Sequence, residues 1–114
     1  MIHHFYTDYT PADPSAKQRQ AVARITWSTQ TWREVPVKDS DLPRLWHEEG
    51  RSFPYVRDVF DFACQSLPNE DILVYTNADI CVRSNCAVVI AASMQDTEAF
   101  YSMRRDFNHD FTEP

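Results

Sequence analysis

The sequence predicts an α/β fold, a three-layer α/β/α sandwich with a mostly parallel sheet. Strand-like segments alternate with helical patterns in the order β-α-β-α-α-β-α-β, which is typical of parallel sheets with right-handed crossovers. The first strand, Ile2 to Tyr6, is apolar or aromatic on both faces, as a strand is when helices cover both sides of a sheet. With 114 residues and 43% hydrophobic content, the chain is expected to form one domain around one modest core.

Side chains alternate between the two faces of this first strand. His3 and Phe5 are expected on one face, and Ile2, His4 and Tyr6 on the other. The simplest interpretation of the histidines is that they pack under a helix, and a catalytic histidine is the alternative.

A helix and a second strand follow. The helix, Ala16 to Thr29, begins at a cap supplied by Asp13 or Ser15. Its predicted buried face consists of Val22, Ile25, Thr26 and Thr29, and the basic residues off that face are expected to be solvated. The strand, Thr31 to Val37, contains Pro36, which favours a position near the sheet edge.

Two helices are predicted in the middle of the chain. A short one, Leu42 to Glu49, has Pro43 in its first turn and Gly50 at its C-cap position. The second opens at Ser52-Phe53-Pro54 and shows the clearest helical spacing of apolar residues, at Val56, Val59, Phe60, Ala63 and Leu67. Gly50 is the only glycine, which excludes every glycine-rich phosphate loop.

The C-terminal part is organised around the stretch Ile72 to Ile80. Its strand-forming start is expected to be the central strand of the sheet. A helix over Cys86 to Met94 and a strand over Glu98 to Met103 complete a single domain, residues 1–107, and residues 108–114 are expected to be a flexible tail.

Composition excludes several classes of function. The formal net charge of -6 disfavours a nucleic-acid or anionic membrane surface, because such binding needs a cationic face. No apolar run is long enough to span a bilayer, and the N-terminus lacks a signal-peptide pattern. The three cysteines form no CxxC pair, although Cys81 and Cys86 as half of a metal site stays an alternative. We therefore expect a cytoplasmic protein with reduced thiols.

Three polar clusters follow predicted strands. They are Thr7-Asp8-Tyr9, Asn77-Ala78-Asp79 and Arg104-Arg105-Asp106. Open parallel sheets bind ligands beyond the carboxyl ends of their strands, so these clusters are the candidate site. Asn77 and Asp79, two residues apart, are expected on the same side of an extended segment, where their oxygens could hold Mg²⁺ or Mn²⁺ together with a diphosphate.

The segment Val74 to Ile80 resembles the strand and DxD-type motif of GT-A glycosyltransferases. It is most similar to a group with Asn-x-Asp-Ile followed by Arg-Arg-Asp, which are here Asn77 to Ile80 and Arg104 to Asp106. The resemblance covers residues 1–107 and implies a Rossmann-like donor-binding half without the acceptor half. It implies that Asp79 contacts the metal or the donor diphosphate, that Asn77 supports it, and that the loop with Asp8 lies near the nucleotide base.

Each candidate also has a purely structural interpretation. Asp79 can cap the following helix, and Asp8 can be a turn residue. Arg104 and Arg105 either pair with phosphate or keep an edge strand soluble. The aromatic residues expected in or near the core are Trp27, Trp32 and Trp46.

Two functions remain open at this point. The first is a metal-dependent transferase domain that binds a nucleotide-diphospho-sugar and passes the sugar to an unknown acceptor. The second is a non-catalytic α/β binding or interaction protein with a degenerate donor site, acting as a homo-oligomer or with a partner subunit. A metal-dependent phosphohydrolase ranks last, because it normally needs more carboxylates than Asp8 and Asp79 supply.

Overall fold

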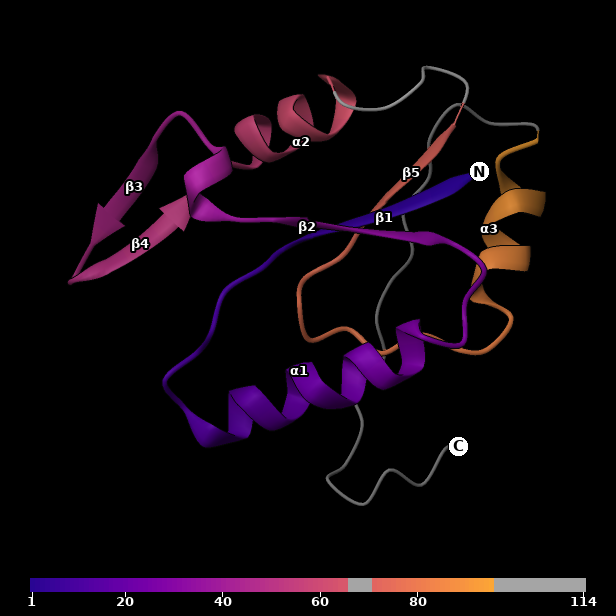
Figure 1. The fold of residues 1–114 in the computed structure, drawn as a ribbon, viewed down its shortest axis with the longest axis horizontal. Helices are drawn as coiled ribbons and strands as arrows, with labels where there is room; N and C mark the ends of the chain where they lie inside the picture. Colours follow the sequence, from indigo (N-terminus) through magenta and orange to yellow (C-terminus); the bar gives the residue numbers. More distant parts are fainter. Residues whose placement is uncertain (66–70, 96–114) are drawn as a thin grey trace.

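A small parallel sheet forms the centre of the fold (Figure 1). The computed structural model describes residues 1–65 and 71–95. The sheet has the order β2-β1-β5, with β1 at Ile2–Thr7, β2 at Arg33–Val37 and β5 at Ile72–Tyr75. Both neighbours run parallel to β1. The predicted parallel α/β arrangement is therefore confirmed for this part of the chain.

In the described part of the chain three α-helices pack around the sheet: α1 at Pro14–Trp27, α2 at Val56–Gln65 and α3 at Cys86–Ser93. Figure 1 shows α1 and α2 on opposite sides of β1. One buried cluster joins the sheet to α1 and α3 and contains Tyr6, Ala23, Trp27, Trp32, Ala78, Ala87 and Ile90. The other joins the sheet to α2 and contains Phe5, Val37, Val59 and Ala63. The alternation predicted for β1 is confirmed, since Tyr6 and Phe5 belong to different clusters.

The prediction that Ile72 to Tyr75 is the central strand is wrong for the described sheet. β1 lies between β2 and β5, and four of its six residues are buried. Every residue of β5 is only half-buried. A strand with a partner on each side and a helix layer on each face has no surface left for solvent, which explains the burial of β1.

The buried face predicted for the first helix is also wrong. The buried residues of α1 are Gln20, Ala23 and Trp27, whereas Ile25 is 68% exposed. Trp27 has the largest apolar area on the helix. Its burial, and not that of the smaller Val and Thr side chains, determines which face of α1 packs on the sheet. The predicted cap is confirmed, because the Asp13 side chain accepts a hydrogen bond from the Ser15 N–H.

The short helix predicted over Leu42 to Glu49 is absent. A short 3-10 helix, η1 at Asp39–Asp41, is followed by an antiparallel hairpin of β3, Leu45–Glu48, and β4, Arg51–Pro54. Glu49 and Gly50 both have positive φ, 50° and 74°, so Gly50 serves a tight hairpin turn and not a helix C-cap. Trp46, expected in or near the core, lies on this hairpin and is 49% exposed.

The predicted middle helix is confirmed as α2, but it begins at Val56, because Ser52 to Pro54 belong to β4. Val59 and Ala63 are buried as predicted, while Val56 and Phe60 are exposed. The predicted position Leu67 lies outside the described residues, as do the strand over Glu98 to Met103 and the tail. Among the helices described, none has the length and apolar character needed to cross a membrane.

Candidate functional site

The polar segments after β1 and β5 lie at the same edge of the sheet. The two strands are parallel neighbours, and the Thr76 N–H donates to the Phe5 carbonyl oxygen at 3.3 Å, which continues the pairing to the end of β5. The Asp8 N–H donates to the Val37 carbonyl oxygen at 2.8 Å and ties the end of β1 to the end of β2. This edge therefore gathers the residues that follow each described parallel strand.

The Asn77–Asp79 segment is a turn and not the extended segment that was predicted. The Ile80 N–H donates to the Asn77 carbonyl oxygen at 3.4 Å, and Ala78 is buried in the core on the α1 side. Burial of Ala78 draws the chain inward, so Asn77 is exposed while Asp79 is half-buried. The two side chains are therefore not arranged as alternate residues of one strand face.

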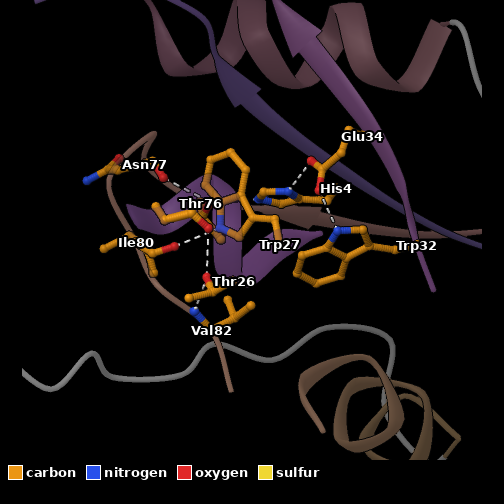
Figure 2. Close-up of polar contacts among 10 residues, drawn as sticks. His4, Thr26, Trp27, Trp32, Glu34, Thr76, Asn77, Ile80 and Val82 are labelled. Carbon is orange, nitrogen blue, oxygen red and sulfur yellow. Dashed lines mark hydrogen bonds and ion pairs between the residues drawn. The ribbon is translucent and has the colours of Figure 1, made fainter. Parts of the chain in front are cut away.

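Helix α1 fixes this turn. Trp27 Nε1 donates to the Ile80 carbonyl oxygen at 2.7 Å, and the Val82 N–H donates to Thr26 Oγ1 at 3.0 Å (Figure 2). Both donors and acceptors are partly buried, so leaving one unpaired would cost stability. The position of the Asn77–Asp79 turn is thus determined by the last turn of α1.

Both candidate carboxylates face arginines of α1. Asp8 Oδ1 lies 3.0 Å from Arg24 Nη2, and Asp79 Oδ2 lies 3.6 Å from Arg19 Nε. The sequence had placed these arginines on a solvated face, and both are indeed exposed while still forming ion pairs. Each candidate carboxylate at this edge is therefore paired with one cation of α1.

The remaining predicted residues of the site are distributed as follows. Thr7 is half-buried at the end of β1, and Tyr9 is exposed. Arg104 and Arg105 lie outside the described residues. Arg57 and Asp58 of α2 form ion pairs away from these segments: Arg57 lies 4.0 Å from Asp61, and Asp58 lies 3.1 Å from Arg44.

Asn77 and Asp79 could hold a divalent metal only as a partial ligand set. Among residues 1–65 and 71–95, no group of three or more histidine, cysteine or acidic side chains is placed to hold a metal ion. Mg²⁺ and Mn²⁺ bound to nucleotides commonly take one or two protein oxygens and complete their shell with phosphate and water. One carboxylate and one amide oxygen have the donor chemistry of such a partial set, although they do not share the strand face predicted for them.

A chain of polar contacts crosses the sheet on its α1 side, and sequence reasoning did not identify it (Figure 2). His4 Nδ1 lies 2.7 Å from Glu34 Oε2 on β2, and His4 Nε2 lies 2.7 Å from Thr76 Oγ1 after β5. Trp32 Nε1 donates to the other Glu34 oxygen at 2.6 Å. This series of contacts ends at Thr76, which directly precedes Asn77, so it connects the buried sheet to the candidate site.

The imidazole of His4 is completely buried between aromatic rings. Trp32 stacks on it at 4.5 Å, and Trp27 meets it edge-on at 4.5 Å. This burial lowers the pKa of His4, and the hydrogen bond and charge of Glu34 oppose the shift. A neutral ring donates from Nδ1 to the carboxylate, which leaves Nε2 as an acceptor for the Thr76 hydroxyl. The single hydroxyl proton of Thr76 is shared between this nitrogen and the Asn77 carbonyl oxygen, 2.9 Å away.

A pocket of about 360 Å³ opens beside this chain of contacts. Its lining combines three aromatic rings with a cation and an anion; the residues are Tyr6, Arg24, Trp27, Ser28, Gln30, Trp32 and Glu34. Burial raises the pKa of the Tyr6 phenol, with Arg24 acting in the opposite direction, so the hydroxyl stays protonated. Gln30 is already engaged, donating to the Arg83 carbonyl oxygen and accepting from the Ala87 N–H.

The three cysteines are free thiols. Burial raises the pKa of Cys81 and of Cys86, so both are protonated and unsuited to act as nucleophiles near neutral pH.

Comparison with known proteins identifies no relative. No protein-family model matches the chain, and neither the curated proteins nor the solved structures contain a significant match.

Proposed function

We propose that this chain is a nucleotide-diphospho-sugar-binding domain of a glycosyltransferase, with a Rossmann-like, three-layer GT-A donor-binding fold. The observation that carries the proposal is the parallel pairing of β1 with β5, which brings the segments Thr7–Tyr9 and Asn77–Asp79 to one edge of the sheet. Helices packed on both sides of that sheet support the fold. The free cysteines support a cytoplasmic location for this activity.

In this proposal Asp79 and Asn77 would hold Mn²⁺ or Mg²⁺ against the donor diphosphate. The ion would supply Lewis-acid stabilisation of the leaving diphosphate. Arg19, which faces Asp79, and Arg24, which faces Asp8, would turn toward the phosphate oxygens of a bound donor. Asp8 would then be free to accept a hydrogen bond from the nucleotide, and Arg104 and Arg105 remain further phosphate ligands in the proposal.

The His4 contacts would keep the donor loop in place. His4 joins Glu34 on β2 to Thr76, one residue before Asn77. Trp27 holds the other end of the same loop through Ile80. A loop anchored at both ends loses little freedom on binding, which favours affinity for the donor.

A non-catalytic binding or interaction protein with a degenerate donor site is the second candidate. The ion pairs at Asp8 and Asp79 favour it, because both carboxylates already have cationic partners. In this form the chain would act as a homo-oligomer or with a partner subunit, and the acceptor would be bound elsewhere.

Calorimetric titration with UDP- and GDP-sugars in the presence of Mn²⁺ tests the first proposal. Wild-type protein is expected to bind at least one donor only when Mn²⁺ is present, and Asp79→Asn is expected to lose that binding. Asp61→Asn, which removes an exposed carboxylate of α2, serves as the matched control and should bind like wild type. If no metal-dependent binding is seen at millimolar donor, the first proposal is contradicted and the non-catalytic candidate is favoured.

A further inference from the structure

The β3–β4 hairpin presents an uncovered aromatic pair. Trp46 and Phe53 are directly opposite each other across the two strands, with ring centroids 5.6 Å apart and planes inclined by 42°. Trp46 is 49% exposed and Phe53 is 36% exposed. Aromatic rings of this size are normally buried, so two exposed rings side by side indicate a contact surface.

The same face of the hairpin carries one cation and one anion. Side chains alternate along each strand, so Glu48 shares a face with Trp46, and Arg51 shares it with Phe53. Glu48 and Arg51 are also paired in register, and the Arg51 guanidinium lies 5.9 Å from the centre of the Phe53 ring. We call these residues, Trp46, Glu48, Arg51 and Phe53, the hairpin platform.

The hairpin platform is held in a defined position. Arg44, at the base of β3, lies 3.1 Å from Asp58 of α2, and its guanidinium stacks 4.5 Å above the Tyr55 ring. The hairpin follows the end of β2, and Figure 1 shows it projecting beyond the carboxyl end of that strand. It therefore lies beyond the same carboxyl edge of the sheet as the proposed donor site, on the side of α2, whereas Asp8 and Asp79 face α1.

We infer that the hairpin platform binds a neutral carbohydrate and is the acceptor subsite of the proposed transferase, an inference that rests on the proposed function. A pyranose ring has a face of C–H groups that stacks on an aromatic ring, and hydroxyls around its rim. Planar guanidinium and carboxylate groups can each bond two neighbouring hydroxyls. Trp46 and Phe53 supply the stacking surface, and Arg51 and Glu48 supply these rim groups.

Charge argues for a neutral ligand. The charges of Glu48 and Arg51 cancel on the platform, while the whole chain has a formal charge of -6. An anionic ligand would meet no uncompensated cation there and would be repelled by the protein as a whole. An apolar peptide would have to desolvate both charged groups without replacing their hydrogen bonds.

Nuclear magnetic resonance tests this inference without any need for donor. Maltohexaose, cellohexaose and mannohexaose are titrated separately into labelled protein, and the three indole N–H signals are followed. Trp46 is assigned from Trp46→Phe. At least one of these sugars is expected to shift the Trp46 signal, while the indoles of Trp27 and Trp32, which are hydrogen-bonded inside the fold, stay unchanged.

Variants separate the possible outcomes. Trp46→Ala is expected to weaken binding by at least about tenfold, whereas His47→Ala, on the opposite face of β3, is expected to bind like wild type. No shift with any of the three sugars, or a shift that survives in Trp46→Ala, would overturn the inference. Tighter binding of a heparin hexasaccharide, or a concentration-dependent Trp46 shift without sugar, would also overturn it in favour of an anionic ligand or a second copy.

Failure of the proposed function gives a different result. Sugar binding at Trp46 without Mn²⁺-dependent donor binding would support the platform and contradict the transferase. Donor binding with no sugar at the platform would support the transferase and contradict the platform.

Discussion

His4 Nδ1 lies 2.7 Å from Glu34 Oε2, and the two residues occupy paired positions on adjacent parallel strands. On the other side of the ring His4 contacts Thr76, so one buried imidazole of β1 links β2 to the residue that follows β5. A buried polar group that is fully paired in this way specifies the strand register, because a shift by one residue would leave it unpaired.

The protonation of His4 gives the first prediction. Its pKa is lowered by burial, so we expect the folded protein to keep His4 neutral at pH values where an unfolded histidine, with a pKa of about 6.5, is charged. The unfolded state then binds more protons, and stability is expected to fall as the pH drops below about 6.5, by at most about 1.4 kcal/mol per pH unit. The charged group that faces the ring is Glu34, while the neighbouring rings of Tyr6, Trp27 and Trp32 are neutral.

Imidazole nitrogen shifts measured between pH 5 and pH 8 report this directly. In Glu34→Gln the titration midpoint should move further down, because the group that raises the pKa of His4 has lost its charge. A midpoint at or above the ordinary histidine value in wild type would contradict the burial described for this ring.

The bond from Trp27 to Ile80 gives the second prediction. Trp27→Phe removes the indole donor, leaves the Ile80 carbonyl oxygen without its partner and opens a gap, and should destabilise the fold by about 1–3 kcal/mol. Trp32→Phe removes the same volume, but the carboxylate of Glu34 that loses its partner is more accessible to water. The loss of unfolding free energy in Trp32→Phe should therefore be smaller. Urea unfolding of both variants measures the difference, and an equal or larger loss in Trp32→Phe would contradict the anchoring role of Trp27.

The hairpin turn gives the third prediction. Glu49 and Gly50 both have positive φ, and a Cβ built at Gly50 meets no atom within 4 Å, so substitution acts through the backbone alone. Gly50→Ala should cost about 1 kcal/mol, and Glu49→Asn should stabilise by roughly 0.5 kcal/mol, because asparagine favours this conformation. Urea unfolding tests both, with Glu48→Asn as a strand control. Stabilisation by Gly50→Ala would contradict the turn.

The ion pair between Arg19 and Asp79 gives the fourth prediction. Their side chains are 54% and 35% exposed, so Arg19→Ala should change the unfolding free energy by less than about 1 kcal/mol. Removing the cation should nevertheless strengthen Mn²⁺ binding at Asp79 by a few-fold. Arg24→Ala, which frees Asp8 instead, is the matched control for a manganese titration followed by electron paramagnetic resonance. Weaker Mn²⁺ binding in Arg19→Ala would contradict a ligand role for Asp79.

Local pattern predicted much of the fold. The strands Ile2–Thr7 and Ile72–Tyr75 and the helices α1, α2 and α3 all follow from propensity, caps and apolar spacing. The helix predicted between Leu42 and Glu49 was wrong, because Gly50 suits the C-cap of a helix as well as the turn of a hairpin. The choice depends on the cross-strand contact between Trp46 and Phe53, which a helix pattern does not reveal.

The candidate site was predictable only at the level of the sheet edge. Because parallel strands end at the same edge of a sheet, the strand pattern predicts that Asp8 and Asp79 lie at one edge. The pattern does not reveal that each carboxylate faces an arginine of α1. The contacts of His4 with Glu34 and Thr76 depend on the register of three strands. The sequence feature that could have indicated these contacts is the presence of polar residues such as His4 and Glu34 within otherwise apolar strands.

Paramagnetic broadening by Mn²⁺ tests the proposed donor site most directly. Amide signals are recorded with Mn²⁺ alone, with Mn²⁺ and a UDP- or GDP-sugar, and in Asp79→Asn. We predict donor-dependent broadening centred on Asn77–Asp79 and extending to Thr7–Tyr9, and its loss in the variant. Broadening that is centred elsewhere, or that is unchanged in Asp79→Asn, would contradict a nucleotide-sugar site at this edge of the sheet.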